Sequence, residues 1–455
     1  MITIHRKYYL FMLLAILTSC KKFLEVAPPN DKLETSSVFA DSTSAAHAII
    51  AIYSQLTSGN LGLLGQKSIT AGLAADELYF TGNNDSYTNF QDNNLQINNS
   101  QLNDIWTDLY AQIYRANAAY EGVNSSSGII PSAKAKLKAE ALFIRAFCYF
   151  YLVNYWGDVP LITSTAYQSN AIKGRSAVTE VYAQIISDLV TAQADLPEDY
   201  PTADRGRPNK WAAAALLART YLYTKDYTNA SIIATNIINQ SGMYNLADLN
   251  LVFKKESSET IWQIVPVTGY TNSWDATIFI PYPDQVPTFA LRDSLVHSFE
   301  SADKRKSSWI NSTTVNNSTY SYPYKYQVQQ ASDITECDII FRLGEIYLIR
   351  AEANIAAGKL ADGEADINTI RSRAGLAGIN IGSKEDGLQA LETERIHELF
   401  AEWGNRWLDL KRWNTADQVL PAIKGNNWQS TDVLWPIPAQ QILLNKSLSQ
   451  NNGYF

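Results

Sequence analysis

The sequence predicts a mostly α-helical protein in which tetratricopeptide-type helix pairs are joined to an irregular, loop-rich region with short strands. Apolar residues recur at helical spacing through several long segments. Small residues within two of these segments fall at the spacing of a helix-pair repeat. Residues 242–331, by contrast, are rich in Pro, Ser, Thr, Asn and aromatic residues and lack a long helical period.

Residues 1–19 have the layout of a removable lipoprotein signal. Arg6 and Lys7 precede ten apolar residues at 8–17, and a Leu-Thr-Ser tripeptide then leads to Cys20. Ten apolar residues are too few to span a hydrocarbon core of ~30 Å. We therefore expect cleavage before Cys20, acylation of that cysteine and attachment to a membrane through the lipid. An ordinary secretion signal with a chance cysteine is the alternative.

Residues 20–35 are expected to form an extended tether, because the consecutive prolines Pro28 and Pro29 block a helix. The folded part is then 36–455. Its periodic segments predict an N-terminal helical part at 36–241, a loop-rich ligand-side region at 242–338 and a C-terminal helical part at 339–455. The expected helices are 42–56, 102–122, 133–156, 177–196, 209–240 with a break near Lys225, 339–357, 360–373 and 387–404.

The helix at 133–156 carries the strongest pattern. Its second half is apolar around the whole circumference except at Arg145 and Asn154, which predicts burial on several sides. Trp156 is followed by Gly157 and then by Pro160, a common helix stop. As the single charge in this stretch, Arg145 is expected to be buried and paired with a carboxylate.

Two helix pairs carry the repeat signal. In the first, the small and apolar residues are Leu217, Ala218, Tyr221, Ala230 and Ala234. A weaker copy runs through 350–371. Because small residues let one helix press against the other, both pairs are expected to stack as in a partial α-solenoid.

Composition narrows the function. The net charge is −8 and the basic residues are scattered, which argues against nucleic acid. The chain has 11 Trp and 26 Tyr, whose flat faces can stack on sugar rings. After acylation of Cys20 only Cys148 and Cys337 remain, so a disulfide framework is not expected.

No catalytic constellation emerges, and the sequence predicts neither a metal nor a cofactor. His397-Glu398 lacks the second histidine of a zinc-binding helix, since Ala401 stands four residues further on. Glu394, Glu398 and Glu402 share one helix face, and a glycosidase needs two carboxylates that face a cleft ~5 to 10 Å apart. Several arginines flank them, so an ion-pair network that locks helices together is the simpler interpretation.

Several ordered segments closely resemble the SusD/RagB outer-membrane lipoproteins of the Bacteroidetes. They are RAFCYFYLVNYWGDVPLI at 145–162, GRPNKWAA at 206–213, RLGEIYLIRAEA at 342–353, the glutamate face followed by RWLDLKRW at 394–413, and PIP with a closing NNGY at 436–454. The resemblance covers essentially the whole mature chain. Two departures are Trp403, where the family often has a small or acidic residue, and Lys21-Lys22, where surface export often goes with acidic residues.

The resemblance implies a SusD-like α-helical fold without chemistry of its own. It further implies a lipid-anchored protein of the cell outer membrane, facing outside, that captures an oligosaccharide. Its partner would be a SusC-like TonB-dependent transporter, over which it acts as a lid.

Ligand contacts in this family lie in variable loops, so the aromatic and amide residues of two loops are the candidates. One loop is the polar stretch at 82–100 with the residues just before it, and the other is the irregular middle region. The candidates are Tyr79, Asn84, Tyr87 and Phe90 in the first, with Phe80 beside them, and Tyr270, Trp274, Tyr282 and Trp309 in the second. Trp274 fits best, because Asn, Ser and Asp flank it.

Three other functions stay open on the sequence alone. The same fold could capture peptides or another polymer. A surface glycoside hydrolase is permitted by the glutamate face at 394–402. A helical-repeat scaffold without ligand is the third.

Overall fold

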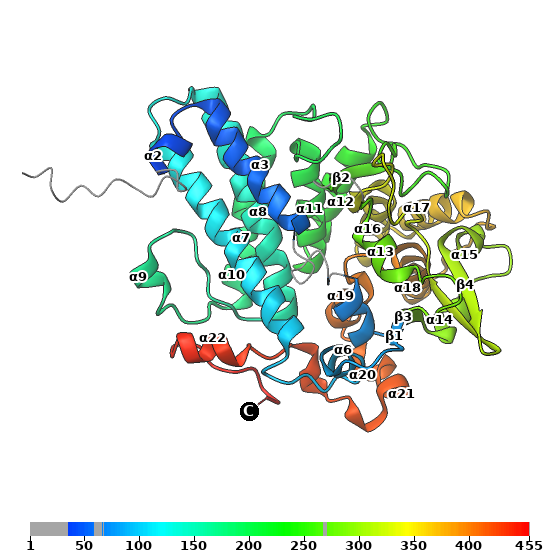
Figure 1. Cartoon of the computed structure of the whole chain (residues 1–455). Coiled ribbons are helices and arrows are strands. Elements are labelled where there is room, and N and C mark those ends of the chain that lie inside the picture. The colour runs from blue at the N-terminus through cyan, green and yellow to red at the C-terminus, as the bar shows by residue number, and fades with distance from the viewer. Residues whose placement is uncertain (1–34, 59–65, 67, 267–270, 455) are drawn as a thin grey trace, which may run out of the picture.

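Helices dominate the computed structural model, which describes residues 35–58, 66, 68–266 and 271–454 (Figure 1). The expected fold class, mostly α with helix pairs and an irregular region of short strands, is confirmed. The predicted signal, Cys20 and the tether up to residue 34 lie outside the described residues.

A bundle around one long helix, α8, forms the N-terminal part. Pro131 occupies the first turn of α8, where its missing N–H costs no hydrogen bond, and Gly157, at φ +73°, ends the helix. Helices α3, α7 and α10 pack against α8. The elements of this part are α2 (Thr35–Val38), α3 (Ser42–Ser58), α5 (Ile69–Ala74), β1 (Leu78–Phe80), α6 (Asp85–Gln91), α7 (Ser100–Ser125), α8 (Pro131–Trp156), α9 (Tyr167–Asn170) and α10 (Val178–Asp195).

The predicted helix pairs follow. Asn209 caps α11 (Lys210–Tyr223) by accepting hydrogen bonds from two backbone N–H groups, and Lys225, at φ +61°, reverses the chain into α12 (Tyr227–Ile238). Ala230 and Ala234 are fully buried, as the repeat spacing requires. The second pair is α16 (Leu343–Ala356) and α17 (Leu360–Arg373). Packing runs in order from α10 through α11, α12 and α16 to α17, which makes a continuous stack.

Between the two pairs in the sequence lies the irregular region. Its strands form three two-stranded antiparallel sheets, two of which join distant segments and one of which joins neighbouring segments. The strand pairs are β1 with β3 (Phe289–Leu291), β2 (Thr260–Ile264) with β6 (Asp338–Arg342), and β4 (Ile310–Val315) with β5 (Ser318–Pro323). The short helices are α13 (Trp274–Phe279), α14 (Asp293–Ser298) and α15 (Lys304–Trp309). The C-terminal part continues with α18 (Lys384–Leu399), α19 (Asn405–Arg412), α20 (Ala416–Val419), α21 (Pro421–Lys424), η2 (Gly425–Asn427), η3 (Ser430–Val433) and α22 (Ala439–Leu444).

Two expected helix boundaries and one expected loop are wrong. Residues 339–342 belong to strand β6 instead of a helix, because they pair with β2. The helix expected at 387–404 ends at Leu399, since Ala401, Trp403 and Gly404 adopt positive φ and turn the chain. The polar stretch at 82–100 contains α6, which Asn84 caps by accepting from the backbone N–H of Ser86.

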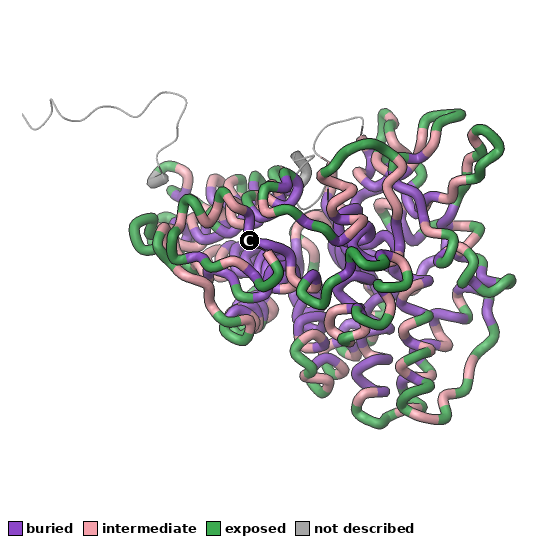
Figure 2. Tube along the Cα trace, turned by 90° about the horizontal axis from the view of Figure 1, so that it is seen from below, coloured by how far each residue is buried: buried purple, intermediate pink, exposed green. Residues whose placement is uncertain are grey.

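One main hydrophobic core runs through the bundle and the irregular region, and a smaller cluster lies between α16, α17 and α18. Buried stretches follow the inner faces of the helices, while exposed residues lie on the outer turns and loops (Figure 2). Arg145 is buried in this core and its guanidinium forms two hydrogen bonds to Asp188, at 2.8 and 2.7 Å, as predicted. Cys148 is buried as a small apolar residue.

Candidate functional site

The first candidate loop and the irregular region meet through the pairing of β1 with β3. Tyr79 lies opposite Ala290, and Phe80 lies opposite Phe289. The ring centroids of Phe80 and Phe289 are 5.5 Å apart, and Tyr87 stands edge-on to Phe289 at 5.0 Å. Phe80, Tyr87 and Phe289 therefore form one aromatic cluster, built from segments some 200 positions apart in the chain.

The other candidates of the first loop have different surroundings. Tyr79 is half-buried on β1, and Asn84 is exposed at the N-cap of α6. Phe90 is fully buried, with its ring 5.0 Å from that of Trp435. Tyr87 is half-buried like Tyr79, so of these candidates Asn84 is the exposed one and Phe90 is the one enclosed in the core.

Trp274 begins the short helix α13 and is half-buried against the core. Its polar neighbours turn inward. The buried Asn272 side-chain oxygen accepts from the backbone N–H groups of Thr335 and Glu336, and the Ser273 hydroxyl caps α13. These polar groups, which motivated the choice of Trp274, hold the backbone in place and do not face solvent.

One turn further along α13, Thr277 and Ile278 line a pocket of about 430 Å³. Tyr282 stands in its wall, 71% exposed. Amides supply much of the remaining lining, from Gln285, Gln327, Gln329 and Gln330. The Gln329 amide donates to the carbonyl of Ile280 at 2.9 Å, which ties the two walls together.

This pocket adjoins the aromatic cluster, because Thr288 in its lining precedes Phe289 in the cluster. Thr81 joins the two segments further by donating to the carbonyls of Pro287 and Thr288. The pocket and the cluster, referred to below as the loop side, thus bring Phe80, Tyr87 and Tyr282 from both candidate loops onto one region. The glutamines were not predicted as ligand contacts from the sequence. Their clustering at 327, 329 and 330, in a polar segment of the loop-rich region, could have indicated them.

Trp309 lies elsewhere. Its ring is 1% exposed, and its indole N–H donates to the carbonyl of Leu249 at 3.0 Å. In this position Trp309 packs in the core and cannot reach a ligand without rearrangement. Tyr270 lies outside the described residues.

The three glutamates of α18 and the following turn are buried in a network of arginines. Arg342 reaches Glu398 at 2.5 Å, Glu402 at 2.8 Å and Glu259 at 2.9 Å. Arg305 binds Glu394 at 2.5 Å and Glu398 at 3.1 Å. The ion-pair interpretation is confirmed, and none of the three glutamates lines the pocket of the loop side.

Electrostatics keep this network ionised at its centre. Burial works to raise the pKa of Glu398, but Arg373, Arg342 and Arg305 together hold it well below its ordinary value. Burial, followed by the positive charge of Arg305, lowers the pKa of the neighbouring His397 to about 4. Burial, by contrast, raises the pKa of Glu394 against the opposing charge of Arg305. Glu398, which stays charged among its arginines, is a poor proton donor.

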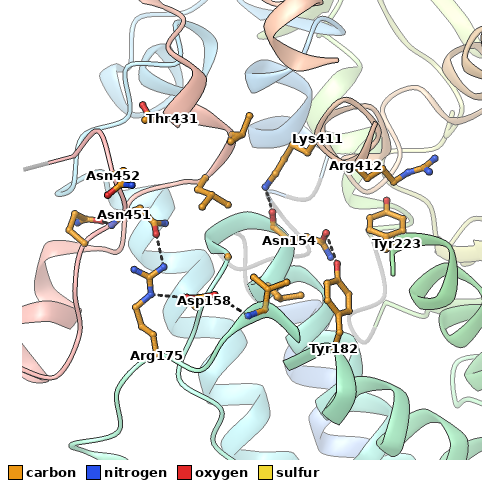
Figure 3. Close-up of a pocket in the computed structure, with 16 residues that line it drawn as sticks. Asn154, Asp158, Arg175, Tyr182, Tyr223, Lys411, Arg412, Thr431, Asn451 and Asn452 are labelled. Carbon is orange, nitrogen blue, oxygen red and sulfur yellow. Dashed lines mark hydrogen bonds between the residues drawn. The ribbon is translucent and has the colours of Figure 1, made fainter. Parts of the chain in front are cut away.

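A second pocket, of about 590 Å³, lies where α8 ends, with α10, α11, α19 and the C-terminal segments around it (Figure 3). Its polar lining includes Asn154, Asp158, Arg175, Tyr182, Tyr223, Lys411, Arg412, Thr431, Asn451 and Asn452. Lys411 donates to the carbonyl of Asn154, and Arg175 donates to Asn451. Burial lowers the pKa of Lys411 to about 7.

Comparison with known proteins gives one consistent result. A family model described as "Starch-binding associating with outer membrane" matches residues 22–222, and the SusD family model matches residues 297–454. SusD-like protein P25 of Formosa agariphila is 26% identical, over 98% of this chain and 98% of that protein.

Two further proteins carry ligand information in their names. The starch-binding protein SusD of Bacteroides thetaiotaomicron is 24% identical, over 73% of this chain and 75% of that protein. The solved structure of surface glycan-binding protein A from the same species, in complex with laminarihexaose, superimposes with a TM-score of 0.79 at 20% identity, covering 90% of this chain and all of that one. The structural likeness shows a shared fold.

Proposed function

Because the chain belongs to the SusD/RagB family, we propose that it is an outer-membrane nutrient-binding protein that captures an oligosaccharide on its loop side. The observation that carries this proposal is the placement of Tyr282, an exposed ring in the wall of a glutamine-lined pocket next to the Phe80, Tyr87 and Phe289 cluster.

Sugar recognition needs two kinds of group, and the loop side has both. An aromatic face covers the apolar C–H face of a pyranose ring, while amides and hydroxyls bind the ring's hydroxyl groups. Tyr282 supplies the first, and Gln285, Gln327 and Gln330 supply the second with exposed side chains. Relatives whose names state a ligand, starch in one and laminarihexaose in the other, support a glycan.

The proposed role is binding without catalysis. Glu394, Glu398 and Glu402 are the carboxylates that the sequence offered for hydrolysis, and their side chains are bound to arginines and a lysine in the interior. Hydrolysis needs one carboxyl group that can give up a proton to the glycosidic oxygen. Incubation of the purified protein with the glycan it binds should therefore release no shorter saccharides.

We propose a SusC-like TonB-dependent transporter as partner, with this chain as the lid, and a lipid on Cys20 as the anchor to the outer membrane. Among the described residues no helix is long and apolar enough to cross a membrane. A Cys20→Ala variant should leave the membrane fraction on washing, whereas retention of the variant would contradict the anchor. Co-purification of a SusC-like transporter with the protein from its native membranes tests the partner, and its absence would contradict the proposed assembly.

The ligand class is tested by presenting an array of plant, algal and microbial oligosaccharides together with a peptide library to the purified protein. Binding to one glycan class, with none to peptides, is the expected outcome. Binding to peptides alone would replace the glycan proposal with peptide capture by the same fold, and no binding to either would favour a scaffold.

A further inference from the structure

The pocket in Figure 3 has the dimensions and walls of a binding site but lies apart from the loop side. Its volume of about 590 Å³ falls within the range of small-molecule sites. The wall comes from segments distant in sequence: the end of α8 with the residues after it, the start of α10 with Arg175 before it, the ends of α11 and α19, and the C-terminal segments 431–434 and 450–452. None of its lining residues belongs to the pocket that contains Tyr282.

Lys411 places a cation in this pocket without a counter-charge. Its ammonium group has three N–H donors. Among the described residues one hydrogen bond is recorded for it, to the carbonyl oxygen of Asn154, and no carboxylate lies within ion-pair distance. The centroid of the Trp407 ring lies 5.8 Å from the ammonium nitrogen.

The two arginines of the pocket lining differ in their partners, since, among the residues described, one is paired with carboxylates and the other is not. Arg412 is neutralised by Glu352 and by Asp409, at 2.8 Å from its Nε. Arg175, like Lys411, bonds neutral oxygens, which are the carbonyls of residues 156, 158 and 449 and the side-chain oxygen of Asn451. Asp158, the carboxylate in the lining, is exposed and accepts from the backbone N–H of Val178 at 2.9 Å. Within the described ranges, the pocket lining therefore holds two cations without a bound carboxylate, Lys411 and Arg175, against the single carboxylate of Asp158, which accepts from the first turn of α10.

Tyr223 adds an unused hydroxyl. It lines the pocket, and its oxygen is buried without a hydrogen-bond partner within the described part of the chain. Buried polar atoms in proteins are nearly always paired, so an unpaired one in a pocket wall indicates a missing donor or acceptor. The amide side chains of Asn451 and Asn452 and the hydroxyl of Thr431 lie in the same lining.

From this geometry we propose that the pocket is a second binding site, which takes a hexuronic acid unit with its carboxylate on Lys411 and its hydroxyls on Tyr223 and the asparagine amides. The carboxylate would supply the absent counter-charge. The ring hydroxyls would satisfy the unpaired tyrosine oxygen. The proposal adds a site to the proposed function and does not depend on binding at Tyr282.

Helix capping accounts for part of the arrangement. Lys411 and Arg175 both donate to carbonyls at the C-terminal end of α8, where positive charge is favourable. Capping uses one of the three ammonium donors of Lys411. It explains neither the unpaired Tyr223 hydroxyl nor the pocket volume, and a ligand would account for both.

Binding should depend on pH through Lys411. The ionisable groups that line the pocket with it are Asp158, Arg175, Tyr182, Tyr223 and Arg412. With its pKa near 7 in the free protein, Lys411 is half-protonated at neutral pH, while a uronate stays charged above about pH 4. An anion on the ammonium raises that pKa, so affinity is full below pH 7 and falls as the pH rises, with proton uptake on binding.

Calorimetric titration of the purified protein with glucuronate, glucose and glucose 6-sulfate tests the site. We expect glucuronate to bind at least about tenfold more tightly than glucose, a difference of about 1.4 kcal/mol. Repeating the titration at pH 7.5 in buffers with different ionisation heats should reveal proton uptake. Tight binding of glucose 6-sulfate as well would widen the ligand class to sugar anions, and equal binding of glucose and glucuronate would overturn the proposal.

A lysine pair provides the matched control. Lys411→Met keeps the apolar stem and should reduce glucuronate affinity at least about tenfold and abolish proton uptake. Lys384→Met removes an exposed ammonium that donates to another helix-end carbonyl, that of Ala356, and should change neither. If Lys411→Met does not fold, the wild-type proton uptake decides, and its absence contradicts the proposal. Tyr282→Ala should leave glucuronate binding intact.

Discussion

The helical scaffold and the loop side differ in where their polar side chains lie: buried and paired in the scaffold, exposed to solvent on the loop side. In the scaffold, Arg342 is buried and hydrogen-bonded to Glu259, Glu398 and Glu402. On the loop side, Tyr282 and the exposed glutamines of its pocket present their polar groups to solvent. Changes in the scaffold should therefore alter the free energy of unfolding, while changes on the loop side should alter ligand affinity and leave stability nearly unchanged.

The largest effect is expected for Arg342→Met. The substitution leaves three buried carboxylates without their shared cation, which should lower the free energy of unfolding by about 5 kcal/mol, the upper end for a broken buried pair. Urea denaturation followed by circular dichroism measures it. A loss below about 1 kcal/mol, the value of a surface ion pair, would show that water reaches this network.

Arg145→Ala should come next, at about 3 to 4 kcal/mol, because it strands Asp188 in the core. Lys136→Ala on the same helix, where the lysine is exposed, is the control and should stay within about 0.5 kcal/mol. Equal melting temperatures for the two variants would contradict a stabilising, buried ion pair between Arg145 and Asp188.

Most of the scaffold could be predicted from the sequence because its helices are specified locally. The 3.6-residue pattern placed α8 within two residues at its start, and the turn at Lys225 was found as a break within the helical pattern of 209–240. Strand β6 was missed because what makes residues 339–342 extended is their pairing with β2, about 80 positions earlier. A sequence pattern carries no record of such a distant partner.

The loop side was predicted less well, for the same physical reason. Tyr282 and Tyr87 were proposed from their loops, but their approach to one region depends on the β1–β3 pairing. Trp309 was proposed from an aromatic-rich segment, and the structure buries it in the core at the end of α15. Flanking Asn, Ser and Asp at Trp274 resembled a sugar site, although these side chains form the cap and turn that begin α13.

His397 should give the scaffold a pH signature that the loop side lacks. Its pKa is about 4 in the fold, against about 6.5 when unfolded, and its ring is 2% exposed. The neutral ring contributes stability above pH 6.5, and that contribution is lost as the pH falls through 4, up to about 3 kcal/mol. Urea midpoints between pH 7 and 4 measure it. His397→Gln should show a shallower decline, and an identical decline would assign the acid sensitivity to the carboxylates.

Trp274→Ala tests the border between the two regions, since the residue is half-buried on α13. If the ring contributes to the loop side, oligosaccharide binding should weaken by about 1 to 3 kcal/mol with the helical fold intact. Tyr167→Ala removes an exposed aromatic ring on α9, away from the loop side in Figure 1, and should leave affinity unchanged. A lower melting temperature with unchanged affinity would show that Trp274 packs in the core and does not contact the ligand.

The central claim is that a glycan binds on the loop side, and Tyr282→Ala tests it most directly. Calorimetry with the glycan selected on the array should show at least about a tenfold loss of affinity, about 1.4 kcal/mol, because the variant removes the exposed stacking face. Its melting temperature should match that of the unaltered protein, since Tyr282 is 71% exposed. Full affinity in a folded Tyr282→Ala protein would contradict the account and place the glycan elsewhere on the molecule.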